Sequence, residues 1–109
     1  SDLFSEGKTL YLPPLKVLYR IMPENDGAAP ARILISVPKR HFKKAVDRNL
    51  IRRRIREAYR QNKMPLLNSL SDSGKHIDLA ILWNDAAIQQ YDITERCIKE
   101  MIVKLSHLE

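Results

Sequence analysis

Thirteen consecutive residues, Arg48 to Arg60, hold the side chains with the clearest chemistry in this sequence. They read RNLIRRRIREAYR and include six arginines but no lysine. A guanidinium presents a planar fork of N–H donors that can bind two oxygens of one phosphate, whereas a lysine ammonium acts as a point charge. These residue types therefore favour a surface that binds phosphate groups.

The positive charge of the chain is concentrated around this stretch. Residues 39–60 contain ten Lys or Arg against two acidic residues, Asp47 and Glu57, which gives the segment a net charge of +8. The whole chain carries +6, so the remaining residues carry −2. Such local basicity indicates a polyanionic partner for one surface of a nearly neutral body.

A helix would separate the arginines of this stretch from its apolar residues, because each residue turns the chain by about 100°. The predicted buried stripe consists of Ile51, Ile55, Ala58 and Tyr59. The opposite side gathers Asn49, Arg52, Arg53, Arg56 and Arg60, which we call the arginine face. Arg48 and Arg54 lie at its margins.

A solvated helix surface is the simplest alternative explanation of the arginine face, but such surfaces usually mix both signs of charge. Unpaired cations at helical spacing repel one another, and only Glu57 is near enough in the sequence to offset this repulsion. We therefore favour a phosphate-binding surface. Asn49 has two interpretations: a tolerated surface residue, or an amide that contacts a sugar hydroxyl or base edge between phosphates.

Apolar runs predict three β-strands, at Leu15–Met22, Arg32–Val37 and His76–Trp83. Turn-forming residues fill positions 23–31, so the first two strands are expected to form a hairpin. The strands before and after the basic helix are expected to be parallel neighbours.

Two helices are expected. The basic helix runs from about Ala45 to Asn62. Residues 65–74 are predicted to be a connection, either irregular or with a helical turn of its own. A second helix begins with a capping box formed by Asp92 and Glu95 and buries an apolar stripe between Ile93 and Leu108. The pattern predicts an α+β fold, a two-layer sandwich with two helices on one sheet.

Composition excludes several functional classes. One cysteine, Cys97, cannot form an internal disulfide and suits a reducing, cytoplasmic location. No apolar run approaches the roughly 20 residues that span a bilayer, so no membrane association is expected. The three histidines, His41, His76 and His107, have no partner at metal-ligand spacing, and we expect no protein metal site, catalytic nucleophile or glycine-rich phosphate loop.

Residues Ser36 to Arg60, SVPKRHFKKAVDRNLIRRRIREAYR, resemble the signature of the protein subunit of bacterial ribonuclease P. In that family a strand, a basic loop and a helix with the motif R-N-x-x-[KR]-R-x-x-[RK] follow one another. The helix motif reads here Arg48, Asn49, Arg52, Arg53 and Arg56. Weaker similarity covers Leu3–Gly7, Val17–Tyr19 and the terminal helix.

The resemblance implies a protein that assists a catalytic RNA, which uses magnesium ions to remove the 5′ leader from precursor transfer RNA. It implies that the protein itself carries no catalytic residue and acts as a monomer in the holoenzyme. The residues expected to dock on the catalytic RNA are Arg48, Asn49, Arg52, Arg53, Arg56 and Arg60. Those expected to line a cleft for the single-stranded leader are Phe4, Tyr19, Ser36, Lys39 and Arg40, since aromatic rings stack on bases and cations follow the backbone.

The resemblance also implies a mixed sheet of about four strands with a left-handed crossover around the basic helix, as in domain two of ribosomal protein S-five. Such crossovers are nearly always right-handed in other proteins. We expect one domain over residues 1–109. The basic tract that usually precedes Leu3 in the family is absent, so the chain is expected to begin inside the protein.

Two other functions are compatible with a basic helix. A non-enzymatic ribosomal or structured-RNA binding protein would share the fold, but it would not affect precursor processing. A helix that reads the major groove of DNA is less favoured, because no preceding helix lies at helix-turn-helix spacing.

Overall fold

Four β-strands form one mixed sheet in the computed structural model, which describes residues 7–22 and 30–107. The strands are β1 (Lys8–Leu12), β2 (Leu15–Met22), β3 (Ala31–Ser36) and β4 (His76–Trp83). They lie in the order β1-β2-β4-β3. Strand β4 is antiparallel to β2 and parallel to β3, so the expected parallel pair around the basic helix is confirmed.

The predicted hairpin between Leu15–Met22 and the strand that follows it is wrong. Strand β4 lies between β2 and β3, and the hairpin partner of β2 is β1, a strand that we did not predict. Leu12 pairs with Leu15 across a turn made by Pro13 and Pro14. A two-residue turn keeps the two strands that it joins adjacent in the sheet. The segment between β2 and β3 is longer, so these strands need not be neighbours and β4 can lie between them.

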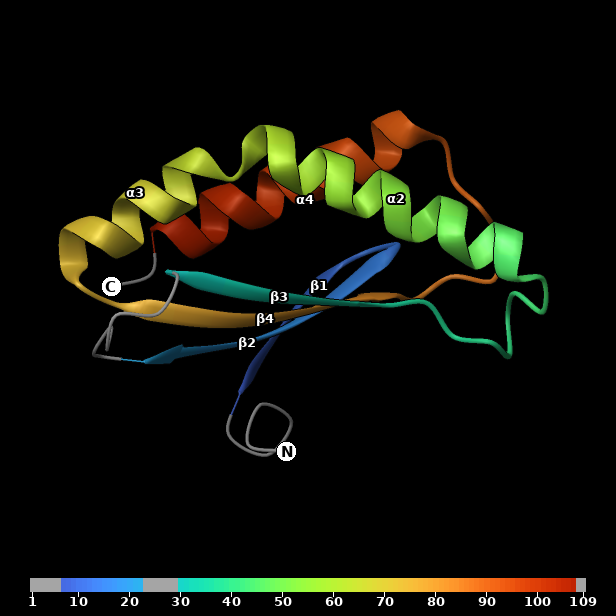
Figure 1. Cartoon of the computed structure of the whole chain (residues 1–109), viewed down its shortest axis with the longest axis horizontal. Coiled ribbons are helices and arrows are strands. Elements are labelled where there is room, and N and C mark those ends of the chain that lie inside the picture. The colour runs from blue at the N-terminus through green and yellow to red at the C-terminus, as the bar shows by residue number, and fades with distance from the viewer. Residues whose placement is uncertain (1–6, 23–29, 108–109) are drawn as a thin grey trace.

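Three helices cover one face of this sheet (Figure 1). Helix α2 (Ala45–Asn62) has the predicted bounds. Helix α3 (Met64–Ser73) occupies a segment that we predicted to be a connection. Pro65 is tolerated there because it lies in the first turn, where a backbone N–H has no helical partner. Leu66 and Leu70, four residues apart, bury one side of α3.

Helix α4 (Tyr91–Ser106) is the predicted terminal helix, but its predicted capping box is wrong. Gln90 occupies the N-cap position and makes no side-chain capping bond, while Asp92 lies inside the first turn. The helix therefore starts earlier than the D-x-x-E pattern indicated. Asp92 still lies at the positive end of the helix dipole, which favours a carboxylate.

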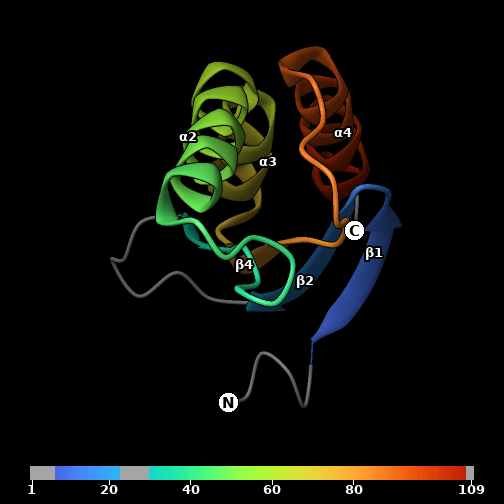
Figure 2. The same cartoon turned by 90° about the vertical axis from the view of Figure 1, so that its right-hand side faces the viewer.

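The crossover from β3 to β4 is left-handed, as expected from the family resemblance. In Figure 1 the chain runs from left to right along β3 and returns through α2 and α3 above the sheet. It then enters β4, which lies parallel to β3 and behind it, as the end-on view in Figure 2 shows. This connection places α2 over the β3 side of the sheet, beside α4.

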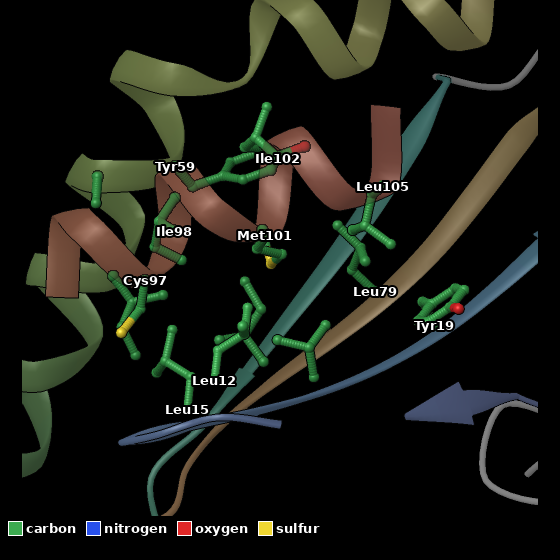
Figure 3. Close-up of a cluster of buried hydrophobic side chains, with 14 of the residues drawn as sticks. Leu12, Leu15, Tyr19, Tyr59, Leu79, Cys97, Ile98, Met101, Ile102 and Leu105 are labelled. Carbon is green, nitrogen blue, oxygen red and sulfur yellow. The ribbon is translucent and has the colours of Figure 1, made fainter. Parts of the chain in front are cut away.

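The hydrophobic core lies between the sheet and the helix layer (Figure 3). Five residues of the predicted α4 stripe are buried: Cys97, Ile98, Met101, Ile102 and Leu105. The prediction is wrong at the start of the helix, where Thr94 is buried and Ile93 is only half-buried. From α2, the buried residues are Ile51, Ile55, Ala58 and Tyr59, again as predicted. Because these four side chains fix how α2 is rotated about its axis, the arginine face is turned away from the core.

Candidate nucleic-acid interface

The arginine face lies on the outer surface of α2. Arg53, Arg56, Arg60 and Asn49 are exposed, and Arg52 is half-buried. Among the described residues, no hydrogen bond or ion pair engages the guanidinium of Arg53 or of Arg56. These two groups therefore have donors available for a ligand that approaches α2 from solvent.

Two members of the arginine face are held in place by neighbours one helical turn away. Arg52 Nη1 donates to Asn49 Oδ1 at 3.3 Å. Asn49 thus positions an arginine, a role that neither of our sequence interpretations included. Arg60 forms a bidentate ion pair with the Glu57 carboxylate: Nε donates to Oε1 at 3.0 Å and Nη2 donates to Oε2 at 2.7 Å.

On the outer surface of α2, Glu57 is the acidic side chain that pairs with the arginine face. Its pKa is lowered from 4.5 to about 2, chiefly by the hydrogen bonds from Arg60 and secondarily by the one from Gln61, whose Nε2 lies 2.6 Å from Oε2. The carboxylate is therefore charged at neutral pH. It occupies the donors of Arg60 that would otherwise be free for a phosphate.

Arg48 differs from the other arginines of the motif. Its Nη1 donates to two backbone carbonyls of the preceding loop, Phe42 O at 2.7 Å and Lys43 O at 3.1 Å. Phe42 is itself buried in the core. Arg48 and Phe42 together fix the basic loop at the start of α2.

The basic loop adds four exposed cations next to α2: Lys39, Arg40, Lys43 and Lys44. Pro38 and the turn at residues 39–41 begin the loop directly after β3. The loop thereby joins the exposed Ser36, at the end of β3, to the first turn of α2. Basic side chains extend without an acidic residue from Lys39 to Lys44.

The five residues predicted to line one cleft do not share one surface. Ser36, Lys39 and Arg40 are exposed and lie close in sequence around the end of β3. Tyr19 is 7% exposed and lies in the core near Leu79 and Leu105 (Figure 3), on the sheet face that the helices cover. Phe4 lies outside the described residues.

Strand pairing explains why Tyr19 and Ser36 are separated. Tyr19 is paired with Leu79, which is buried under the helices, whereas Ser36 is paired with Leu82. Successive residues of a strand point to opposite faces, so Leu79 and Leu82 lie on opposite faces of β4. The predicted grouping of Tyr19 with Ser36 is wrong for this reason.

The sheet face opposite the helices carries a polar cluster that our sequence analysis missed. Asp78 on β4 accepts a hydrogen bond from Arg32 Nε at 3.3 Å and lies 3.8 Å from Arg20 Nη2. The Nε2 atom of His76 lies 2.8 Å from Asp78 Oδ1. Arg20 on β2 and Arg32 on β3 are both paired with Asp78 on β4. An arginine in each strand that flanks this aspartate is the sequence signal that could have indicated the cluster.

Comparison with known proteins identifies the family. A sequence model of the Ribonuclease P family matches residues 1–106. The chain belongs to this family. The ribonuclease P protein component of Porphyromonas gingivalis is 33% identical over 106 residues, which cover 97% of this chain and 77% of that protein. The corresponding component of Chlorobaculum tepidum is 39% identical over 93 residues, covering 80% and 60% of the two chains.

Solved structures of ribonuclease P proteins share the fold. The protein of Staphylococcus aureus superposes with a TM-score of 0.70 at 21% identity, covering 97% of this chain and 86% of the other. That of Thermotoga maritima gives 0.62 at 24% identity, with coverage of 98% and 88%. The family resemblance read from Ser36 to Arg60 and the predicted α+β fold are thus both confirmed.

Two further findings concern metal-binding clusters and membrane spans. Within residues 7–22 and 30–107, no three His, Cys, Asp or Glu side chains come together in a way that could hold a metal ion. None of the helices in the same residues combines the length and hydropathy of a membrane span.

Proposed function

We propose that this chain is the RNA-binding protein subunit of ribonuclease P and assists a catalytic RNA in the magnesium-dependent removal of the 5′ leader from precursor transfer RNA. The observation that carries the proposal is the arginine face, displayed on the outside of α2 in a chain of this family. The proposed docking residues are those of the face together with Arg48. The protein would act as a monomer in the cytoplasm.

Docking by this surface is electrostatic. Each RNA phosphate that an arginine neutralises releases condensed counterions, which makes binding tight at low salt and steeply salt-dependent. Arg53 and Arg56 have free donors, and Arg52 is oriented by Asn49, so their guanidinium groups need little rearrangement before they bind phosphate oxygens. Neutralised phosphates in turn repel an incoming RNA substrate less strongly.

The loop after β3 is the proposed contact for the leader. Ser36, Lys39 and Arg40 remain exposed beside the start of α2, where a strand bound near the arginine face would pass. Cations there follow a sugar–phosphate backbone without regard to base sequence. Tyr19 supports β2 from the core side in this proposal and does not contact the leader.

Magnesium ions are proposed to bind mainly to the RNA. The described part of the chain offers no cluster of three ligating side chains, whereas Mg²⁺ prefers oxygen ligands and readily binds phosphate oxygens. Bound there, the ions would activate the attacking water and stabilise the charge that develops on the phosphate. The protein's own groups contribute by binding and orienting the two RNA molecules.

Reconstitution tests the proposal directly. The chain is mixed with a bacterial ribonuclease P RNA at a magnesium concentration where the RNA alone cleaves slowly, and precursor cleavage is followed by gel electrophoresis. We expect cleavage to accelerate when the chain is present, because its cations replace part of the screening that high magnesium supplies.

The same assay contains the result that would contradict the proposal. If the chain bound the RNA but left cleavage unchanged, it would be a structured-RNA binding protein without a role in processing. Equal competition by duplex DNA and folded RNA would favour a DNA-binding helix.

Replacing Lys39 and Arg40 by Ala should weaken binding of precursor more than of mature transfer RNA. An equal loss for both RNAs would show that these two residues do not contact the leader.

Glu57→Gln is expected to strengthen RNA binding. The substitution removes the negative charge that pairs with Arg60 and one of the two oxygens that accept its hydrogen bonds, so a phosphate competes more easily for the Nε and Nη2 donors. We expect affinity for the catalytic RNA to rise about two- to five-fold at low salt, a change of the size measured for exposed ion pairs. Fluorescence anisotropy with labelled RNA measures the change, and an unaltered or weaker affinity would show that Arg60 does not bind phosphate.

A further inference from the structure

A hollow of about 420 Å³ lies beside the arginine face, between α2 and the start of α4. Its lining consists of Leu50, Arg53, Arg54, Glu57 and Tyr91. This volume falls within the range of roughly 300–1,000 Å³ that is typical of small-ligand sites. The hollow contains none of the core stripe of α2, and the docking surface proposed above shares only Arg53 with it.

Helix geometry explains why the hollow adjoins the arginine face. Arg53 lies at the edge of that face, while Leu50, Arg54 and Glu57 follow it around the helix toward α4 at spacings of one to four residues. A ligand bound to Arg53 therefore contacts both regions. An RNA strand whose phosphates lie along the arginine face would carry one nucleotide past the mouth of the hollow.

The far wall of the hollow is fixed by a hydrogen bond between two elements. Arg54 Nη1 donates to the backbone carbonyl of Gln89 at 2.7 Å, which ties the segment before α4 to α2. Tyr91, the first residue of α4, also packs against the hydrophobic core. The wall is thus held in place before any ligand arrives, which lowers the entropic cost of binding.

The side chains that line the hollow suit a nucleobase better than a phosphate. Leu50 supplies apolar surface, Tyr91 an aromatic ring and Arg53 a guanidinium plane, which are the groups that hold unstacked bases in RNA complexes. The Tyr91 hydroxyl is buried and has no hydrogen-bond partner among the described residues. Glu57 places a carboxylate in the same hollow, which disfavours an anion there.

We infer that this hollow binds one unpaired nucleobase of the RNA that the arginine face holds, with Tyr91 and Leu50 contacting the base and Arg53 bridging to its phosphate. The inference rests on the proposed function, because it places the base relative to an RNA docked on α2. The contact with the base involves uncharged groups, whereas the proposed contacts of the arginine face with RNA are electrostatic.

Tyr91→Ala tests the inference through affinity and salt dependence together. Loss of a base–aromatic contact typically weakens affinity by roughly 5- to 150-fold, so we expect binding of the catalytic RNA to weaken by about 10-fold. The slope of log affinity against log salt should not change, since no phosphate contact is lost. Tyr11→Ala is the matched control, because Tyr11 is 66% exposed on β1, at the far side of the sheet from α2.

A direct probe uses the unaltered chain. Nucleoside 5′-monophosphates are titrated into isotope-labelled protein, with ribose 5-phosphate as the ligand that lacks a base. We expect the methyl resonances of Leu50 and the ring resonances of Tyr91 to shift with the nucleotides and to stay in place with ribose 5-phosphate. Equal shifts with both ligands would show a phosphate site and overturn the inference.

The failure of this inference is distinguishable from failure of the proposed function. If replacement of Arg52, Arg53 and Arg56 abolished RNA binding while Tyr91→Ala left it unchanged, the arginine face would stand and the nucleobase site would be rejected. If the arginine substitutions left RNA binding unchanged, the proposed docking surface itself would be wrong.

Discussion

Replacing Arg52, Arg53 and Arg56 together by Ala is expected to weaken binding of the catalytic RNA by about 100-fold or more at low salt. Hydrogen bonds to charged groups contribute about 1.5–3 kcal/mol each, so the loss of three such contacts exceeds any effect of a single surface substitution. The slope of log affinity against log salt should fall by about 2, because each phosphate contact contributes roughly 0.7–0.9. Filter binding at several salt concentrations measures both quantities.

A control variant separates this effect from the loss of net charge. Arg96, Lys99 and Lys104 are exposed on α4, and replacing them by Ala removes the same three charges from a different helix. We expect that variant to retain nearly all of its RNA affinity. Equal weakening by the two triple variants would mean that overall charge, and not the arrangement on α2, determines binding.

A second comparison tests the geometry of the guanidinium groups. Replacing the same three arginines by Lys keeps the charge but removes the planar fork of donors. We expect affinity between those of the unaltered chain and the Ala variant, with the salt slope preserved. Full affinity in the Lys variant would show that the three positions act as point charges.

Local patterns were sufficient to predict α2 and its two sides. The helix, its bounds and its four buried residues depend on periodicity within eighteen residues, because Ile51, Ile55 and the Ala58–Tyr59 pair follow one another at spacings of three or four. The same reasoning fails for strand pairing. Strand β4 lies more than fifty residues beyond β2 and inserts between β2 and β3, so no pattern near the Pro23–Ala31 segment reveals that the hairpin is absent.

The outcome for Tyr19 shows what alternation could have predicted. Leu15, Val17 and Tyr19 occupy alternate positions of β2, and all three are buried on the helix side of the sheet. Two strongly apolar residues in that set already indicate a core face, so Tyr19 could have been assigned to it from the sequence. The family pattern alone led us to place it with exposed residues.

Other parts of the site depend on tertiary contacts that the sequence does not encode locally. The bond from Arg48 to the Phe42 carbonyl requires the loop to fold back on α2. The hollow at Tyr91 requires α4 to begin beside the middle of α2, thirty-eight residues after Arg53 in the chain. Residue types at these positions are ordinary, and their grouping appears only when the helices pack.

Ile55→Ala is expected to destabilise the fold by about 2–5 kcal/mol, the cost of deleting a fully buried aliphatic side chain. Ile55 is 0% exposed and lies on the core side of α2, in the same helical turn as Arg52 and Arg56 on the outer side. Chemical denaturation followed by circular dichroism measures the free energy of unfolding. Val46→Ala on the same helix is the matched control, because Val46 is 69% exposed and its truncation should change that free energy by less than about 0.5 kcal/mol.

The RNA affinity of the Ile55→Ala variant tests whether the two sides of α2 act independently. Below the temperature at which it unfolds, the variant should bind RNA with nearly unaltered affinity and salt slope, because its arginine face is intact. The triple arginine variant should show the reverse, with near-normal stability and lost affinity, since relief of cation repulsion offsets small losses of packing. If Ile55→Ala weakened RNA binding as much as it weakened the fold, the two sides of α2 would not act independently, and the assignment of docking to one side would fail.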